Sequence, residues 1–184
     1  MEDLIGVAMG KSFNFPVHPN MHLFVSKKLQ ASKLSRKETG MVGLSIIADL
    51  DAKGSRLRSK DGLMYYFDRD RRELMRATSP MRSGPIILDD AFNSLLYSKY
   101  SLTTNDQRVL KWLAAQYASE EPIAAVEPKR SMFIKGDSLY YQINKSQFVI
   151  CNATQPAALH DNGEEGTLFQ AINGEELSAG DLQK

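Results

Sequence analysis

The sequence contains very little cysteine and no long apolar run. Cys151 is the only cysteine, so the chain has no internal disulfide and no thiolate-based zinc site, which fits a reducing compartment. No stretch approaches the roughly 18 consecutive apolar residues of a membrane span. The start, MEDLIGVAMG, is acidic where a secretory signal is basic. These absences predict a cytoplasmic protein that makes no use of a membrane.

Motifs that indicate catalysis are also missing. The chain has no GxxxxGK[ST] phosphate loop and no serine, cysteine or histidine arrangement typical of a nucleophile. His18 and His22 are four apart, but Pro19 lies between them and His160 is far away, which argues against a helical metal-ligand pair. We therefore expect no metal, no cofactor and no enzyme activity, although an enzyme without a recognisable motif is left open.

One acidic grouping has a catalytic alternative. The segment ADLDAKG places Asp49 and Asp51 near Lys53, a combination that some nucleases use around a divalent ion. Carboxylates followed by lysine and glycine are also how many helices end. We favour the helix end.

The charge of the chain is divided along its length. Its 184 residues, 42% of them apolar, are enough for one sizeable core or two small ones. Residues 21–82 hold 14 Lys and Arg against 7 Asp and Glu, a local charge of +7, while residues 83–184 hold 8 against 13, a local charge of −5. Such an imbalance predicts an anionic partner for the first half.

Four helices are predicted from caps and spacing. Asn20 can cap a first helix, and Ser35 with Glu38 forms a capping box for a second, which Gly54 ends. Asp89 or Asp90 can also cap a short helix through Tyr97. The clearest helix is in TNDQRVLKWLAAQYASEE, where Thr104 and Gln107 make a capping box before an apolar stripe.

Two β-hairpins are predicted. The first has strands at 63–67 and 73–76 around an Asp-rich turn, and the second has Gly136-Asp137 as a two-residue loop, followed by a third strand in SQFVICN. The segment TSPMRSGPIIL contains Ser79-Pro80 and Gly84-Pro85, which are typical of a connector. It indicates a division into a basic helix-helix-hairpin region, 1–82, and a region with a helix, a hairpin and an acidic tail, 83–184. The fold class is therefore α+β, with helices packed on short antiparallel hairpins and the two regions possible parts of one domain.

The first hairpin carries the candidate binding residues. Arginine presents a planar fork of donors suited to phosphate, and a hairpin turn can project it along a nucleic-acid backbone. The alternative is a solvated surface whose charges pair with nearby carboxylates. The predicted nucleic-acid-binding set is Lys27, Lys28, Lys33, Arg36, Lys37, Arg56, Arg58, Lys60, Tyr65, Arg69, Arg71 and Arg72.

The adjacent tyrosines of this hairpin point to opposite sides of their strand. We expect one of Tyr65 and Tyr66 in the core, which leaves the other as a candidate platform for base stacking. The later segment GDSLYYQINKSQFVICNA repeats the tyrosine pair but has Asn144 and Lys145 where the first hairpin has arginines. Chance is favoured over duplication, and the arginines are therefore not needed to form such a hairpin.

Two helices before a basic hairpin also match the order of a winged-helix arrangement. In addition, the runs RLRSKDGLMYYFDRDRRELMR, RVLKWLAAQY and SMFIKGDSLYYQINKSQFVIC together resemble the region before the ATPase core of primase-helicase-like proteins from phages and other mobile elements. The resemblance covers roughly residues 56 to 152 and rests on strand pattern and spacing. The chain departs from the family in having no Walker motif and no primase carboxylate set.

That resemblance implies an accessory module that helps a replicative helicase or ATPase engage DNA or another replication protein. The end of the chain, NGEELSAGDLQK, fits both a natural end and a fragment cut before an ATPase domain. The competing hypothesis is a protein-interaction or inhibitor protein that acts through its acidic second half.

Overall fold

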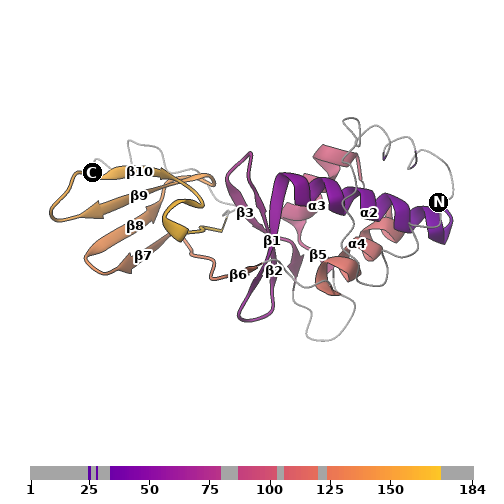
Figure 1. The fold of residues 1–184 in the computed structure, drawn as a ribbon, viewed down its shortest axis with the longest axis horizontal. Coiled ribbons are helices and arrows are strands. Elements are labelled where there is room, and N and C mark those ends of the chain that lie inside the picture. The colour runs from indigo at the N-terminus through magenta and orange to yellow at the C-terminus, as the bar shows by residue number, and fades with distance from the viewer. Residues whose placement is uncertain are drawn as a thin grey trace.

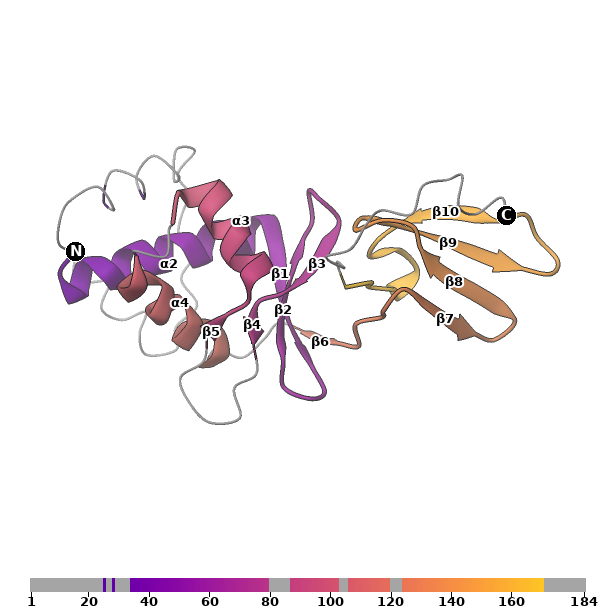
Figure 2. The same ribbon diagram turned by 180° about the vertical axis from the view of Figure 1, so that it is seen from behind.

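The described residues form two four-stranded β-sheets and one short strand pair, with the helices gathered on one side of the first sheet. A computed structural model describes residues 34–79, 87–102, 106–119 and 124–170, together with Val25 and Lys28. The helices lie on one side of the first sheet and the second sheet lies on its other side (Figure 1). The view from behind shows the same order of layers (Figure 2). The fold is α+β, as the sequence predicts.

Helix α2, Arg36–Lys53, begins and ends where the sequence indicates. The Ser35 Oγ atom accepts a hydrogen bond from the Glu38 backbone N–H at 3.2 Å, and the Glu38 Oε2 atom accepts one from the Ser35 N–H at 2.9 Å, which confirms the capping box. Gly54 then starts strand β1 directly. A side chain there would collide with the Phe67 carbonyl and the Tyr66 ring, so this close approach requires glycine.

The first sheet contains the predicted hairpin. Its strands are β1, Gly54–Ser59, β2, Met64–Asp68, β3, Glu73–Arg76, and β6, Ala124–Val126, in the order β3-β2-β1-β6. All neighbours are antiparallel except β1 and β6, which run parallel. Both sides of this sheet are covered, and every residue of β2 is therefore buried. An alternating exposed and buried pattern is absent from this strand for that reason.

Two further helices follow a short strand pair made of β4, Thr78–Ser79, and β5, Ile87–Leu88. Of the two predicted caps, Asp89 is the one that caps α3, Asp90–Tyr100, by accepting a hydrogen bond from the Ala91 N–H. The helix is one turn longer than the predicted end at Tyr97. Helix α4, Gln107–Ser119, confirms the clearest prediction, while its expected cap Thr104 lies outside the described residues.

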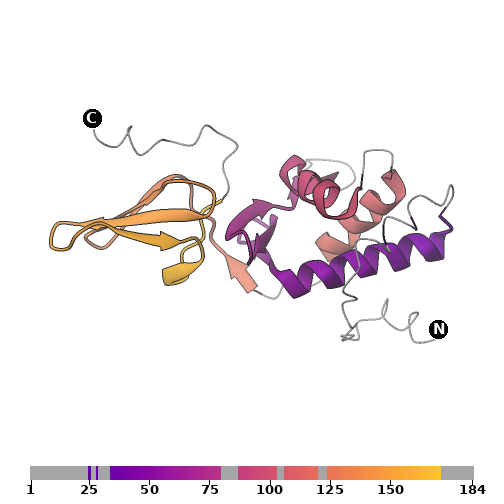
Figure 3. The same cartoon turned by 90° about the horizontal axis from the view of Figure 1, so that it is seen from above.

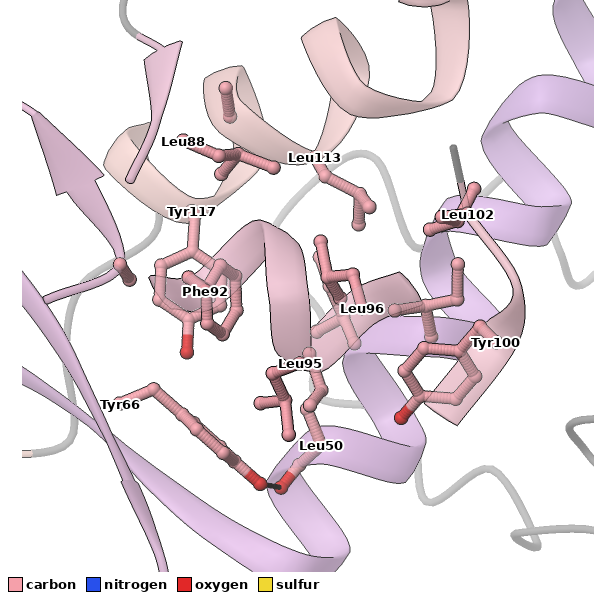
Figure 4. Close-up of a cluster of buried hydrophobic side chains, with 14 of the residues drawn as sticks. Leu50, Tyr66, Leu88, Phe92, Leu95, Leu96, Tyr100, Leu102, Leu113 and Tyr117 are labelled. Atoms are coloured by element: carbon pink, nitrogen blue, oxygen red, sulfur yellow. Dashed lines mark hydrogen bonds between the residues drawn. The ribbon is translucent and has the colours of Figure 1, made fainter. Parts of the chain in front are cut away.

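One hydrophobic core joins these helices to the inner side of the first sheet (Figure 4). Tyr66 and Tyr117 both pack against Phe92, with ring centroids 5.8 and 5.1 Å away, and the Tyr66 hydroxyl donates to the Leu50 carbonyl at 3.0 Å. The core contains residues from both sides of residue 82, which means that a boundary there would cut it. The expected division at residue 82 therefore does not separate two cores, because α3 and α4 complete the core that α2 begins.

The second sheet is an antiparallel meander (Figure 3). Its strands are β7, Met132–Lys135, β8, Ser138–Gln142, β9, Gln147–Asn152, and β10, Ala158–Asp161, in chain order across the sheet. Gly136 adopts a φ of +60° in the two-residue loop between β7 and β8, as the turn chemistry predicts. Strand β10 and the short helix η3, Glu164–Gly166, lie in what the sequence indicated only as a polar tail.

The segment after β10 connects the two sheets. Leu168 packs on the outer side of the first sheet, beside Tyr65, Phe67 and Leu74, whereas Phe169 enters the aromatic cluster of the second. The backbone of this segment forms one bridge to β3, between Leu74 and Gln170, and one to the connection between β6 and β7, between Lys129 and Phe169. The segment is therefore a middle layer that contributes side chains to the cores of both sheets.

The winged-helix expectation is not confirmed. The hairpin of β2 and β3 is part of a four-stranded sheet that is covered on both sides, whereas a wing projects beside its helices. Of the expected first helix, Val25 and Lys28 are helical and the remainder lies outside the described residues. Among the described helices, none is long and apolar enough to cross a membrane.

Two glycines of α2 give a matched test of how α2 and α4 pack. A Cβ at Gly43 would collide with the Trp112 ring of α4, whereas at Gly40 it would lie 3.9 Å from Trp112 Nε1, an ordinary contact. We expect Gly43→Ala to lower the free energy of unfolding by about 1–3 kcal/mol. Gly40→Ala should raise it by about 0.5–1 kcal/mol, because alanine favours the helix. Urea unfolding measures both, and equal effects would contradict this packing.

Candidate nucleic-acid interface

The turn between β2 and β3, residues 69–72, is built around the side chain of Asp68. Asp68 is fully buried, and its Oδ1 atom accepts hydrogen bonds from the backbone N–H groups of Asp70 and Arg71 at 3.1 and 3.2 Å. Its Oδ2 atom accepts one from Lys99 Nζ of α3 at 2.9 Å. A single carboxylate therefore shapes the turn and ties it to a helix.

The ionisation of Asp68 follows from these contacts. Burial opposes the charged form, but the Lys99 ammonium and the two backbone N–H groups outweigh it, and together they hold the pKa of Asp68 below its usual value. The carboxylate is therefore charged at neutral pH, and its charge is balanced by Lys99.

Arg69 is used to cap a helix. Its Nη2 atom donates to the carbonyl oxygens of Asp51, Ala52 and Gly54 at 3.0, 3.2 and 2.9 Å, and its backbone N–H donates to the Lys53 carbonyl. These carbonyls are at the C-terminus of α2, where a positive charge is favourable. Arg69 thus joins the turn to the helix, and the Nη2 side of its guanidinium is used for contacts within the protein.

Arg71 and Arg72 are exposed like Arg69, but the described residues do not hold their side chains. Both are solvent-exposed, and neither side chain forms an ion pair or hydrogen bond with any residue that the structure describes. Arg72 has a φ of +56°, in the left-handed region, which completes the reversal of the chain. Asp70 and Glu73 lie beside them in sequence and partly offset the positive charge.

Several predicted residues have structural positions instead. Arg56 is buried, forms a two-point ion pair with Asp51 at 2.8 Å for each contact, and lies over the Tyr117 ring. Arg58 is half-buried, with its Nε atom 3.3 Å from Met64 Sδ. Tyr65 is only 5% exposed. The expectation that one tyrosine of the pair is free for base stacking is wrong, because the sheet is covered on both sides and each ring has its own core.

The remaining basic residues do not gather around the turn. Lys60 is exposed in the loop between β1 and β2, at the opposite end of β2 (Figure 1). Arg36 and Lys37 are exposed at the start of α2, where Lys28 pairs with Glu38 at 3.8 Å. An 18-residue helix is about 27 Å long, so this group is remote from the turn at the other end of α2. Lys27 and Lys33 lie outside the described residues.

Sequence reasoning missed a buried polar network at the end of α2. The Asp49 Oδ2 atom accepts hydrogen bonds from Lys53 Nζ at 2.9 Å and from the Tyr100 hydroxyl at 2.7 Å. Burial, followed by the Asp49 carboxylate, raises the pKa of Tyr100. Asp49 and Asp51 are thus each engaged by protein partners. No group of three or more potential metal ligands occurs among the described residues. The i,i+4 spacing of Asp49 and Lys53 was the available signal for part of this network.

The comparisons with known proteins add no relative. No family model, no curated protein and no solved structure matches this chain. The described residues therefore define an α+β protein with a basic hairpin turn, and its role must be argued from that geometry.

Asp68 should make the protein sensitive to acid. Because its pKa is lower in the folded than in the unfolded state, its contribution is complete above about pH 4 and is lost as pH falls through the lowered pKa. Asp68→Asn replaces an acceptor with a donor facing Lys99, and should cost about 2–4 kcal/mol at pH 7. The difference from wild type should shrink below about pH 4. Denaturant unfolding across pH, with exposed Asp70→Asn as the control, tests this, and a constant difference would contradict it.

Substitution of Arg69 and substitution of Arg71 should have different effects on stability. Arg69→Ala removes charged hydrogen bonds to three carbonyls and should lower the free energy of unfolding by about 1–2 kcal/mol. Arg71→Ala, which keeps the backbone contact to Asp68, should change it by less than about 0.5 kcal/mol. Thermal and urea unfolding measure both. An equal loss for the two variants would show that Arg71 also has a structural role.

Proposed function

We propose that the chain binds nucleic acid, and DNA in particular, through the turn between β2 and β3, as an accessory module of a mobile-element replication protein. The observation that carries the proposal is the pair of exposed arginines, Arg71 and Arg72, on a turn that the protein holds in shape. The replication role rests on the family resemblance of the sequence alone.

The turn suits phosphate binding because folding already fixes its backbone and its position on the protein. Asp68 fixes the turn backbone and Arg69 fixes its position on α2, so only the Arg71 and Arg72 side chains have to be ordered by the ligand. A preorganised site loses less entropy on binding. Two guanidinium forks one residue apart can contact adjacent phosphates, which contribute affinity without base specificity.

The separated basic groups suggest how a longer ligand would lie. Arg36 and Lys37 are at the start of α2 and the arginine turn is near its end, about 27 Å apart along the helix axis. That length corresponds to roughly eight base pairs of duplex at 3.4 Å per step. We therefore assign the primary contact to the turn, with the start of α2 as a secondary contact for a ligand that runs along the helix.

The alternative function, an interaction through an acidic second half, finds little excess of negative charge in the second sheet, which makes up most of the described part of that half. Residues 124–170 contain four Lys and Arg against five Asp and Glu, so the second sheet with its connections is almost neutral. The negative charge of the second half is concentrated elsewhere in the sequence. This balance favours the nucleic-acid proposal.

Binding to labelled single-stranded and duplex oligonucleotides tests the proposal. We expect fluorescence anisotropy to show micromolar affinity at low salt, falling linearly in log affinity against log salt. Arg71→Glu with Arg72→Glu should weaken binding at least tenfold and make the salt slope shallower by about 2, because two phosphate contacts are lost.

Lys145→Glu is the matched control, because Lys145 is an exposed cation in the corresponding turn of the second sheet. It introduces half the charge change of the double variant in the second sheet, outside the arginine turn, and should leave both affinity and salt slope near the wild-type values. Absence of binding at low salt would refute the proposal. Equal losses for the control and the double variant would show that binding depends on overall charge and not on this turn.

A further inference from the structure

The second sheet has one packed side and one uncovered side. On the packed side, Phe133 stacks on Tyr140 with ring centroids 4.6 Å apart, and Phe148 and Phe169 lie 5.3 Å from each other. These rings form the aromatic cluster that the connecting segment completes. Strand alternation sends the residues between them to the opposite side.

That opposite side is apolar as well. The strand register places Met132, Tyr141, Val149 and Leu159 in one row across all four strands, and Ile134, Leu139 and Cys151 in a second row across three. We call these seven residues the outer face. Met132, Ile134 and Leu159 are 57%, 75% and 59% exposed. An antiparallel sheet with one solvated side normally has polar residues there, which makes the outer face unusual.

The first sheet shows what covers such a surface elsewhere in this protein. Its two sides are both apolar and both covered, one by α2, α3 and α4 and the other by the segment that carries Leu168. The outer face has no equivalent layer among the described residues, since its three most exposed side chains are each more than half accessible. Apolar patches of several hundred Å² on a protein surface usually mark an interaction site.

We propose that the outer face is a dimer interface at which a second copy of this chain packs, sheet against sheet. The seven residues include no charged side chain, and Asp161, which lies beyond Leu159 on the same side of β10, accepts a hydrogen bond from Gln147 Nε2 at 3.4 Å. Two copies can therefore meet over the two apolar rows without like-charge repulsion, whereas those rows offer a charged partner nothing to pair with. A two-fold axis that lies in the interface, parallel to the two sheets and along a row, lets each row contact its own counterpart, with side chains interdigitating between sheets about 10 Å apart.

The area of the outer face agrees with a weak dimer. The exposed side chains present roughly 500 Å² per copy, or about 1,000 Å² for a pair, which is at the lower limit for a specific interface. We therefore expect association at tens of micromolar and not at nanomolar concentration. No part of this inference rests on nucleic-acid binding, because the outer face and the arginine turn share no residue.

Sedimentation velocity across about 5–200 µM protein tests the proposal in the full chain. The wild-type mass should rise with concentration from 20.6 kDa toward twice that value. Ile134→Glu should remain monomeric throughout, because each copy would bury a charge against apolar side chains. Ile134 is 75% exposed, so the fold should survive, which circular dichroism checks.

Two further variants make the result unambiguous. Leu159→Glu, on the other edge strand, should abolish dimer formation in the same way. Ile87→Glu changes a 46% exposed apolar residue of β5, outside the second sheet, and should dimerise like the wild type. A wild-type chain that stays monomeric at the highest concentration would overturn the proposal, as would a dimer that persists in both outer-face variants. In the first case, the outer face would be left for a different protein partner.

Discussion

Burial of strand β2 on both sides is the constraint on which the rest of the structure depends. Tyr66 joins the helices in one core, while Tyr65 and Phe67 hold the connecting segment on the other side. At the end of the strand, the buried Asp68 shapes the turn and binds Lys99. A single five-residue strand therefore fixes the helices, the middle layer and the turn together, and a change to it is expected to affect all three.

The basic residues divide into those that hold the fold and those left for a ligand. Arg56, Lys53 and Lys99 neutralise buried or half-buried carboxylates, and Arg69 satisfies carbonyls at the end of α2. Only a minority of the positive charge near the hairpin is therefore available at the surface. The local charge of +7 overstates the binding potential of this half, because Lys53 and Arg56 pair with carboxylates of α2 and Arg69 is held at the end of that helix.

The two hairpins that carry a tyrosine pair have similar sequences but lie in different environments. Tyr65 and Tyr66 are both buried, whereas Tyr140 is buried and Tyr141 lies half-buried on the outer face. The strands themselves are alike. The difference comes from the layers around them, since helices cover the first sheet and no described segment covers the outer face of the second. A preference for strand structure is local, but the number of covered sides is a property of the whole chain.

The sequence by itself determined the local elements, namely the Ser35 capping box, the Asp89 cap, both hairpins and the α4 helix, because caps, turns and periodicity act over a few residues. It also indicated an α+β fold. Only the tertiary structure decided that Arg56 and Arg69 serve the fold, that neither tyrosine of the first pair reaches solvent, and that α3 and α4 share a core with α2. Those outcomes depend on contacts between residues far apart in the chain, such as Lys99 with Asp68 and Tyr100 with Asp49, which no local pattern encodes.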